Sequence, residues 1–140
     1  MKNNFISGAF IIKDSKFLFG KRSDVKSWYP GVWDLIGGHS FAGEDPLDTL
    51  KRELLEEIGI TDINAQLINT LFIMGQEGSK ENMAYHIYIV TSWKGKLTNR
   101  CNEHSEIRWF NRWDLDAISL AAPEYLNLID KLIKEQKIQK

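Results

Sequence analysis

One segment of this sequence constrains the fold more than any other, because it predicts a helix with both of its ends defined. The apolar residues that would form one stripe along this helix are Leu47, Leu50, Leu54 and Ile58. Asp45 is placed as the N-cap, and Pro46 occupies the first helical position. Gly59 is placed to end the helix just past its last turn. A helix that is apolar on one side needs a covering layer, so a layered fold is expected.

Strand-forming segments lie on both sides of this helix. The predicted strands are residues 5–12, 16–22, 33–36, 63–74, 83–93 and 106–110. Lys13-Asp14-Ser15 predicts a hairpin turn between the first two strands, and the polar residues 75–82 predict a loop. Strands interspersed with two substantial helices favour an α/β fold, an α/β/α sandwich around a mixed central sheet.

A second amphipathic helix is expected near the end of the chain. Residues 112–118 predict a brief helical turn, and Pro123 then opens the helix. The residues expected on its inner side are Leu126, Ile129, Leu132 and Ile133. Three tryptophans are interpreted as structural: Trp33 in the core, and Trp109 and Trp113 in patterns typical of the core and of packing under this last helix.

The overall composition disfavours several classes of protein. The formal net charge is only -1 over 140 residues, so neither nucleic acid nor a membrane surface is expected as a partner. The single cysteine, Cys101, excludes an internal disulfide and a cysteine-rich zinc site. No apolar run approaches the ~20 residues of a membrane span, and the first residues do not resemble a signal peptide. One domain over residues 1–140, located in the cytoplasm, is therefore expected.

Three acidic residues share one face of the first predicted helix. Glu53, Glu56 and Glu57 stand at positions i, i+3 and i+4, beside the apolar stripe. Charges of one sign so close together repel one another, which does not stabilise a helix. A hard divalent cation would turn this repulsion into ligation, because Mg²⁺ prefers oxygen ligands. Taken alone, however, three acids favour an ordinary solvated face, which is common on helices.

The residues around these acids form a longer pattern. Residues 38–60 are GHSFAGEDPLDTLKRELLEEIGI, which resembles the Nudix (MutT-like) signature G-x5-E-x7-R-E-U-x-E-E-x-G-U, where U is bulky and aliphatic. The residues at its fixed positions are Gly38, Glu44, Arg52, Glu53, Leu54, Glu56, Glu57, Gly59 and Ile60. The order of predicted elements on either side is also similar to that family. The resemblance implies a Nudix-type sandwich in which residues 38–60 form a loop–helix–loop catalytic motif.

The resemblance also implies roles for the matched residues. Glu53, Glu56 and Glu57 would be catalytic residues that bind Mg²⁺, with Mn²⁺ as a substitute. Glu53 is in addition a candidate general base or orienter of the attacking water. Arg52 belongs to the same catalytic set, although with Glu44 it is expected to organise the loop–helix–loop rather than to touch substrate.

Further metal ligands are expected outside the helix. By resemblance, the carbonyl of Gly38 would join the metal shell, and Glu103 would supply a carboxylate from the loop before a late strand. Glu106 is the less favoured alternative, because it begins the predicted strand. His104 is close enough in sequence to be an alternative base, although a surface histidine without a role fits equally well.

Substrate contacts are expected from the segment that precedes the motif. Lys21 and Arg22 end a predicted strand, and Arg22 suits bidentate binding of phosphate. A solvated strand end is the alternative for this pair. Trp28 and Tyr29, in the loop that follows, could stack on a nucleobase, and anchoring of that loop is equally plausible.

The expected partner is a small-molecule nucleotide, and a homodimer stays open. The best expectation is a Mg²⁺-dependent pyrophosphohydrolase that cleaves a (d)NTP to (d)NMP and pyrophosphate, with an oxidised nucleotide as one variant. A nucleotide-sugar or ADP-ribose diphosphatase is the first alternative. A non-catalytic Nudix domain that senses a nucleotide is the second.

Overall fold

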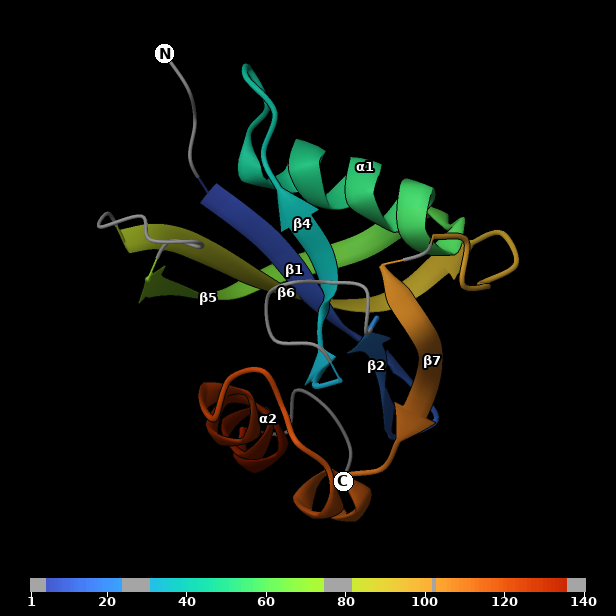
Figure 1. Cartoon of the computed structure of the whole chain (residues 1–140), viewed down its shortest axis with the longest axis vertical. Helices are drawn as coiled ribbons and strands as arrows, with labels where there is room; N and C mark the ends of the chain where they lie inside the picture. Colours follow the sequence, from blue (N-terminus) through green and yellow to red (C-terminus); the bar gives the residue numbers. More distant parts are fainter. Residues whose placement is uncertain (1–4, 24–30, 75–81, 102, 136–140) are drawn as a thin grey trace.

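The computed structural model describes residues 5–23, 31–74, 82–101 and 103–135, and Figure 1 shows a sheet with a helix on either side of it. The strands are β1 (Phe5–Lys13), β2 (Lys16–Arg22), β3 (Trp33–Asp34), β4 (Ile36–His39), β5 (Thr61–Met74), β6 (Asn82–Lys94) and β7 (His104–Phe110). The helices are α1 (Pro46–Ile58), the 3₁₀ helix η1 (Trp113–Ala117) and α2 (Glu124–Lys134). None of the helices in these residues is long and apolar enough to cross a membrane.

The strands form one mixed sheet. Its hydrogen-bonded path runs β3-β2-β1-β6-β5, while β4 pairs with β1 and β7 pairs with β2. β1 and β6 are parallel, and the remaining strand pairs are antiparallel. The predicted hairpin at the start of the chain and the predicted mixed central sheet are both confirmed.

Each face of the sheet is covered by one of the two long helices. Alternate residues of β1 point to opposite faces: Phe10 packs in the cluster that includes α2, whereas Ala9 and Ile11 pack in the cluster that includes α1. Leu50 and Leu54 of the α1 stripe are fully buried, and each such side chain contributes about 1.5–3 kcal/mol. Two apolar cores therefore enclose the sheet, as expected for an α/β/α sandwich.

Both ends of α1 are defined by the predicted signals. The Asp45 side chain accepts a hydrogen bond from the Asp48 N–H at 2.8 Å, and Asp48 accepts one from the Asp45 N–H at 3.3 Å. This capping box satisfies two N–H groups that a helix start leaves without partners. Gly59 ends the helix in the left-handed conformation, with φ at 75°, where a glycine has no Cβ penalty. The helix is thus held in one register.

The strand predicted at residues 33–36 is in fact two strands. β3 pairs with β2, whereas β4 pairs with β1 and continues through Gly37 to His39. This pairing brings the two backbones so close that a Cβ on Gly37 would lie 2.0 Å from the Ser7 carbonyl oxygen. Gly37 and Gly38 are therefore part of β4, and at Gly37 only a residue without a side chain fits.

Two further expectations for the packing need correction. In α2 the buried residues are Tyr125, Leu128, Ile129 and Leu132, so the inner face is turned relative to the predicted stripe. Leu126 and Ile133 are only partly buried. The Tyr125 phenol is accommodated inside because its hydroxyl donates a 2.5 Å hydrogen bond to Asp34. Trp33 is core, as predicted, but Trp113 is 62% exposed, so its predicted packing under the last helix is wrong.

Candidate active site

The three acids of α1 share a face, but their exposure to solvent differs greatly. The exposed fraction of the side chain is 55% for Glu56, 12% for Glu53 and 4% for Glu57. Glu57 lies nearest to the apolar stripe and is therefore buried between α1 and the segment that leads into β7. The carboxylates thus extend from solvent into the protein, rather than forming the ordinary solvated face that was the alternative.

The Arg52 guanidinium connects these acids to the loop before α1. Its Nε and Nη2 donate to the two carboxylate oxygens of Glu44, at 2.7 and 3.0 Å. Nη1 donates to Glu53 at 2.9 Å and to Glu56 at 3.2 Å. The guanidinium also lies 3.6 Å from the centre of the Phe41 ring, a cation–π distance. One cation therefore lies between three carboxylates.

Glu44 in turn holds the loop in its conformation. It accepts hydrogen bonds from the Phe41 N–H at 2.7 Å and from the Thr49 hydroxyl at 2.9 Å. The hydrogen bonds from Arg52, more than any other contact, lower the pKa of Glu44 from 4.5 to about 2. Glu44 is consequently ionised at neutral pH and anchors the loop to the first turns of α1.

Gly38 of β4 lies against the carboxylate of Glu53. A Cβ added to Gly38 would come within 2.6 Å of the Glu53 carboxyl carbon and one of its oxygens, closer than van der Waals contact allows. The absence of a side chain at this position lets the β4 backbone approach an acid of α1. Gly38 and Glu53 are thereby brought to one place, which is compatible with their predicted roles as neighbouring ligands.

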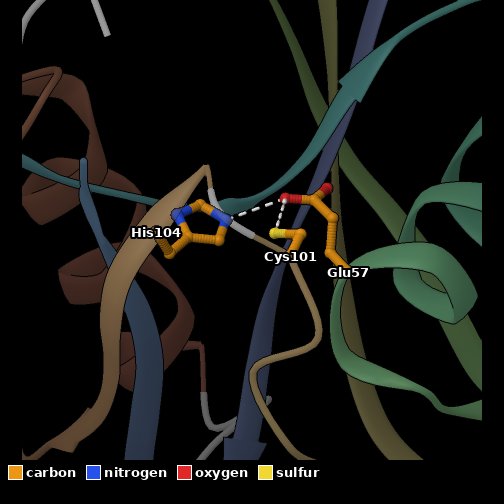
Figure 2. A group of neighbouring side chains, drawn as sticks. All are labelled: Glu57, Cys101 and His104. Atoms are coloured by element: carbon orange, nitrogen blue, oxygen red, sulfur yellow. Dashed lines mark hydrogen bonds and ion pairs between the residues drawn. The ribbon is translucent and has the colours of Figure 1, made fainter. Parts of the chain in front are cut away.

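Figure 2 shows a buried contact to Glu57 that sequence spacing did not reveal. His104 Nε2 lies 2.8 Å from Glu57 Oε1, and the Cys101 thiol donates to the same oxygen at 3.9 Å. His104 is only 8% exposed, so the alternative of a surface histidine is wrong. The two partners stand more than 40 residues from Glu57, and no local pattern could have joined them.

Glu57 is placed where an ionised carboxylate is disfavoured. Burial, followed by the proximity of Glu53, raises the pKa of Glu57, and the charge of Glu103 acts in the same direction. Within the described residues, Glu57 Oε2 is buried without a hydrogen-bond partner when both acids are ionised. A proton shared with Glu53 would satisfy this oxygen, and so would a cation. The acid cluster therefore fits a divalent cation.

Glu103 is better placed than Glu106 to join this cluster. Glu103 directly precedes β7, and its charge acts on Glu57. Its carbonyl accepts a hydrogen bond from the Ser23 N–H at 2.9 Å, which ties this segment to the end of β2. The Glu106 carboxylate instead pairs with Arg108 at 2.8 Å. The assignment of Glu103 as a ligand stays a prediction.

Of the predicted substrate contacts, Lys21 and Arg22 lie at the end of β2, both partly buried. Arg22 Nη1 is 3.8 Å from Asp34 Oδ2. Arg22 is thus held beside an acid of β3 rather than being an ordinary solvated strand end. Trp28 and Tyr29 lie outside the described residues.

The chain is similar in sequence to a known domain family and to known proteins. A profile of the NUDIX domain matches residues 5–132. The chain is 36% identical over 99 residues to the 8-oxo-dGTP diphosphatase of Haemophilus influenzae, covering 71% of this chain and 68% of that one. It is 29% identical over 123 residues to the nucleoside triphosphatase NudI of Escherichia fergusonii, covering 82% and 86%.

A solved structure shows the same fold. The MutT protein of Methanosarcina mazei Go1 superimposes with a TM-score of 0.78 at 20% sequence identity, over 96% of this chain and 95% of that one. The mixed sheet between two helices is thus a known fold. The chain belongs to the Nudix family. It is a hydrolase that acts on phosphoanhydride bonds.

Proposed function

We propose that this Nudix hydrolase is a Mg²⁺-dependent nucleotide pyrophosphohydrolase that converts a (d)NTP to (d)NMP and pyrophosphate, with Mn²⁺ as a substitute cofactor. Two relatives support a nucleotide substrate, since one is named 8-oxo-dGTP diphosphatase and the other nucleoside triphosphatase. The observation that carries the proposal is the buried carboxylate of Glu57 against that of Glu53. Two acids so placed favour a bound cation.

The residues proposed to hold the cation surround this pair. Glu53, Glu56, Glu57 and Glu103 offer carboxylate oxygens, and Gly38 offers its backbone carbonyl. Such oxygen donors suit Mg²⁺, which avoids sulfur and nitrogen. When bound there, the cation would neutralise phosphate oxygens and acidify a nearby water.

The chain's own residues would place the substrate and take up the proton. Arg22 and Lys21 supply positive charge for the phosphates, and Trp28 and Tyr29 are the proposed stacking partners of the base. Arg52 holds one oxygen of Glu53 at 2.9 Å, which orients that carboxylate. Glu53 is then the proposed general base for water.

The proposed hydrolysis needs no reactant other than water and the nucleotide. The water oxygen attacks an inner phosphorus, forms the new P–O bond and passes its proton to Glu53. The bond from that phosphorus to the bridging oxygen breaks. The nucleoside monophosphate and pyrophosphate are the two products.

The substrate assignment is tested with a panel of nucleotides in the presence of Mg²⁺ or Mn²⁺. The (d)NTPs, 8-oxo-dGTP, ADP-ribose and a sugar nucleotide are compared by kcat/KM, and ¹⁸O from labelled water is followed into the products. Label in the monophosphate or in pyrophosphate supports attack at an inner phosphorus. Release of labelled orthophosphate contradicts it, and a higher kcat/KM on ADP-ribose or the sugar nucleotide refutes the triphosphate assignment.

The proposed metal ligands are tested by substitution. Glu56→Gln is expected to lower kcat by about 10³-fold, the effect of losing preorganised electrostatics, with little change in melting temperature because Glu56 is exposed. Glu103→Gln is expected to weaken activation by Mg²⁺, whereas Glu106→Gln, whose carboxylate pairs with Arg108, is its matched control. Equal effects of the two substitutions would contradict the assignment of Glu103 as a metal ligand.

A further inference from the structure

The cluster of Glu57, Cys101 and His104 has a donor set that differs from that of the carboxylates beside it. One carboxylate oxygen, one thiol sulfur and one imidazole nitrogen all lie within 4.8 Å of one another. We propose that this cluster binds a borderline-soft divalent cation of the Zn²⁺ or Co²⁺ type. A cation bound there would compete with the hard cation for Glu57.

The chemistry of the donors separates the two kinds of cation. Thiolate and imidazole are ligands that Zn²⁺ accepts readily, together with carboxylate oxygen, whereas Mg²⁺ prefers oxygen alone. A single cysteine among mixed ligands is a different arrangement from the cysteine-rich zinc site that the composition excludes. Three protein ligands would leave one tetrahedral position for water.

The distances between the donors suit such a cation after a small adjustment. Metal–ligand bonds of about 2.0–2.3 Å in a tetrahedral site separate neighbouring donors by roughly 3.3–3.7 Å. The contact from His104 Nε2 to Glu57 Oε1 is 2.8 Å, and the contact from Cys101 Sγ to that oxygen is 3.9 Å. All three donor atoms lie within 4.8 Å of one another, so shifts of about one ångström would seat the ion. The thiol proton would pass to solvent on binding.

The three ligands are held in place by the surrounding fold. The Arg100 N–H donates to the Glu57 carbonyl at 2.7 Å, which fixes the residue before Cys101 against the end of α1. The Asn99 side chain donates to the His104 carbonyl at 2.9 Å. The His104 ring lies over Gly20 of β2, where a Cβ would come within 2.5 Å of it. Cys101 is partly exposed, which gives an ion a route from solvent.

Sharing of Glu57 gives the site a regulatory consequence, and this part rests on the proposed role of Glu57 in hydrolysis. An ion on Cys101 and His104 would draw the Glu57 carboxylate away from Glu53. Mg²⁺-dependent hydrolysis would then be inhibited by low concentrations of Zn²⁺. Binding itself does not depend on the proposed substrate.

Co²⁺ is the direct probe of binding. Because Cys101 is the only cysteine, a thiolate-to-cobalt charge-transfer band in the purified protein can arise from this residue alone. We expect that band, its displacement by Zn²⁺, and its loss in Cys101→Ser. His104→Gln should weaken Co²⁺ binding by more than about tenfold, since losing even an outer partner of a metal costs 10–100-fold. His39→Gln is the matched histidine control and should keep the wild-type band.

Inhibition is measured separately, with each variant compared with its own rate in Mg²⁺. The Zn²⁺ concentration that halves this rate should rise by about tenfold or more in Cys101→Ser. Absence of the Co²⁺ band in the wild type, or an unchanged Co²⁺ affinity in His104→Gln, overturns the site. Equal inhibition of wild type and Cys101→Ser overturns the regulatory part. Failure of (d)NTP hydrolysis would leave the Co²⁺ result intact, so the two proposals fail separately.

Discussion

Replacing Arg52 by alanine would remove the cation that joins the loop before α1 to the acids of the helix. Arg52 donates two hydrogen bonds to Glu44, one to Glu53 and one to the His39 carbonyl at 2.8 Å. The side chains of Arg52 and Glu44 are only 18% and 17% exposed. The substitution would therefore leave an ionised Glu44 in a partly buried place without its counter-charge.

The loss of free energy of unfolding in Arg52→Ala has a lower and an upper limit. Exposed ion pairs contribute about 0–1 kcal/mol, whereas removing one partner of a buried pair costs about 3–5 kcal/mol. A pKa of Glu44 lowered from 4.5 to about 2 corresponds to about 3 kcal/mol before screening by solvent is discounted. Glu44 keeps its hydrogen bonds from Phe41 and Thr49, which reduces the loss. We expect Arg52→Ala to lower the free energy of unfolding by about 2–3 kcal/mol.

The measurement is urea unfolding at neutral pH, with Arg112→Ala as the matched control. Arg112 also makes a bidentate contact, to Asp130 at 2.7 and 3.1 Å, and is 12% exposed. Asp130 itself is 54% exposed, so it returns to water when Arg112 is lost, and the cost should be about 1 kcal/mol. If Arg52→Ala costs no more than Arg112→Ala, the argument from burial of the Glu44 carboxylate is wrong.

Three further predictions concern pH, the approach of β4 to α1, and the tryptophans. Folding lowers the pKa of Glu44, so the stability that its ionised carboxylate contributes is present above pH 4.5 and is lost as the pH falls towards about 2. The cost of Arg52→Ala should therefore shrink over this range. A constant cost in acid unfolding would exclude Glu44 as the stabilising partner of Arg52. Gly38→Ala would place a Cβ 2.6 Å from the Glu53 carboxylate, so kcat should fall by about 10–100-fold with a small change in melting temperature. A retained kcat would show that the Glu53 carboxylate can move without loss of activity. In urea unfolding, Trp33→Ala should lower the free energy of unfolding by about 3–5 kcal/mol, but Trp113→Ala by less than about 1 kcal/mol, because the two residues are 6% and 62% exposed. Similar losses in the two variants would contradict the exposed position of Trp113.

Features set by neighbouring residues could be predicted from the sequence. The start of α1 depends on Asp45 and Pro46, and its end on Gly59, so these signals act within one or two helical turns. The hairpin between β1 and β2 depends on Asp14 and Ser15, which both adopt positive φ. The motif at residues 38–60 likewise depends on short spacings, and it was sufficient to indicate the family.

Sequence periodicity indicated which elements are amphipathic, but less reliably which residues are innermost. In α1, the predicted stripe residues Leu50, Leu54 and Ile58 are fully buried, and Leu47 is partly buried and packs against the same core. In α2 the aromatic Tyr125 belongs to the inner face, because its hydroxyl donates a hydrogen bond to Asp34, which is far away in the sequence. An isolated helix contains no information about such a partner.

The tertiary structure alone determined the environment of the acids. Helical spacing gives Glu53, Glu56 and Glu57 one face, whereas only the packing of the segment before β7 against α1 buries Glu57 and leaves Glu56 in solvent. The contact of Glu57 with His104 spans 47 residues. It exists because pairing of β2 with β7 carries His104 over Gly20, next to the end of α1. Short-range spacing places charges along a helix, but their solvation and partners depend on chain segments that only the folded sheet brings together.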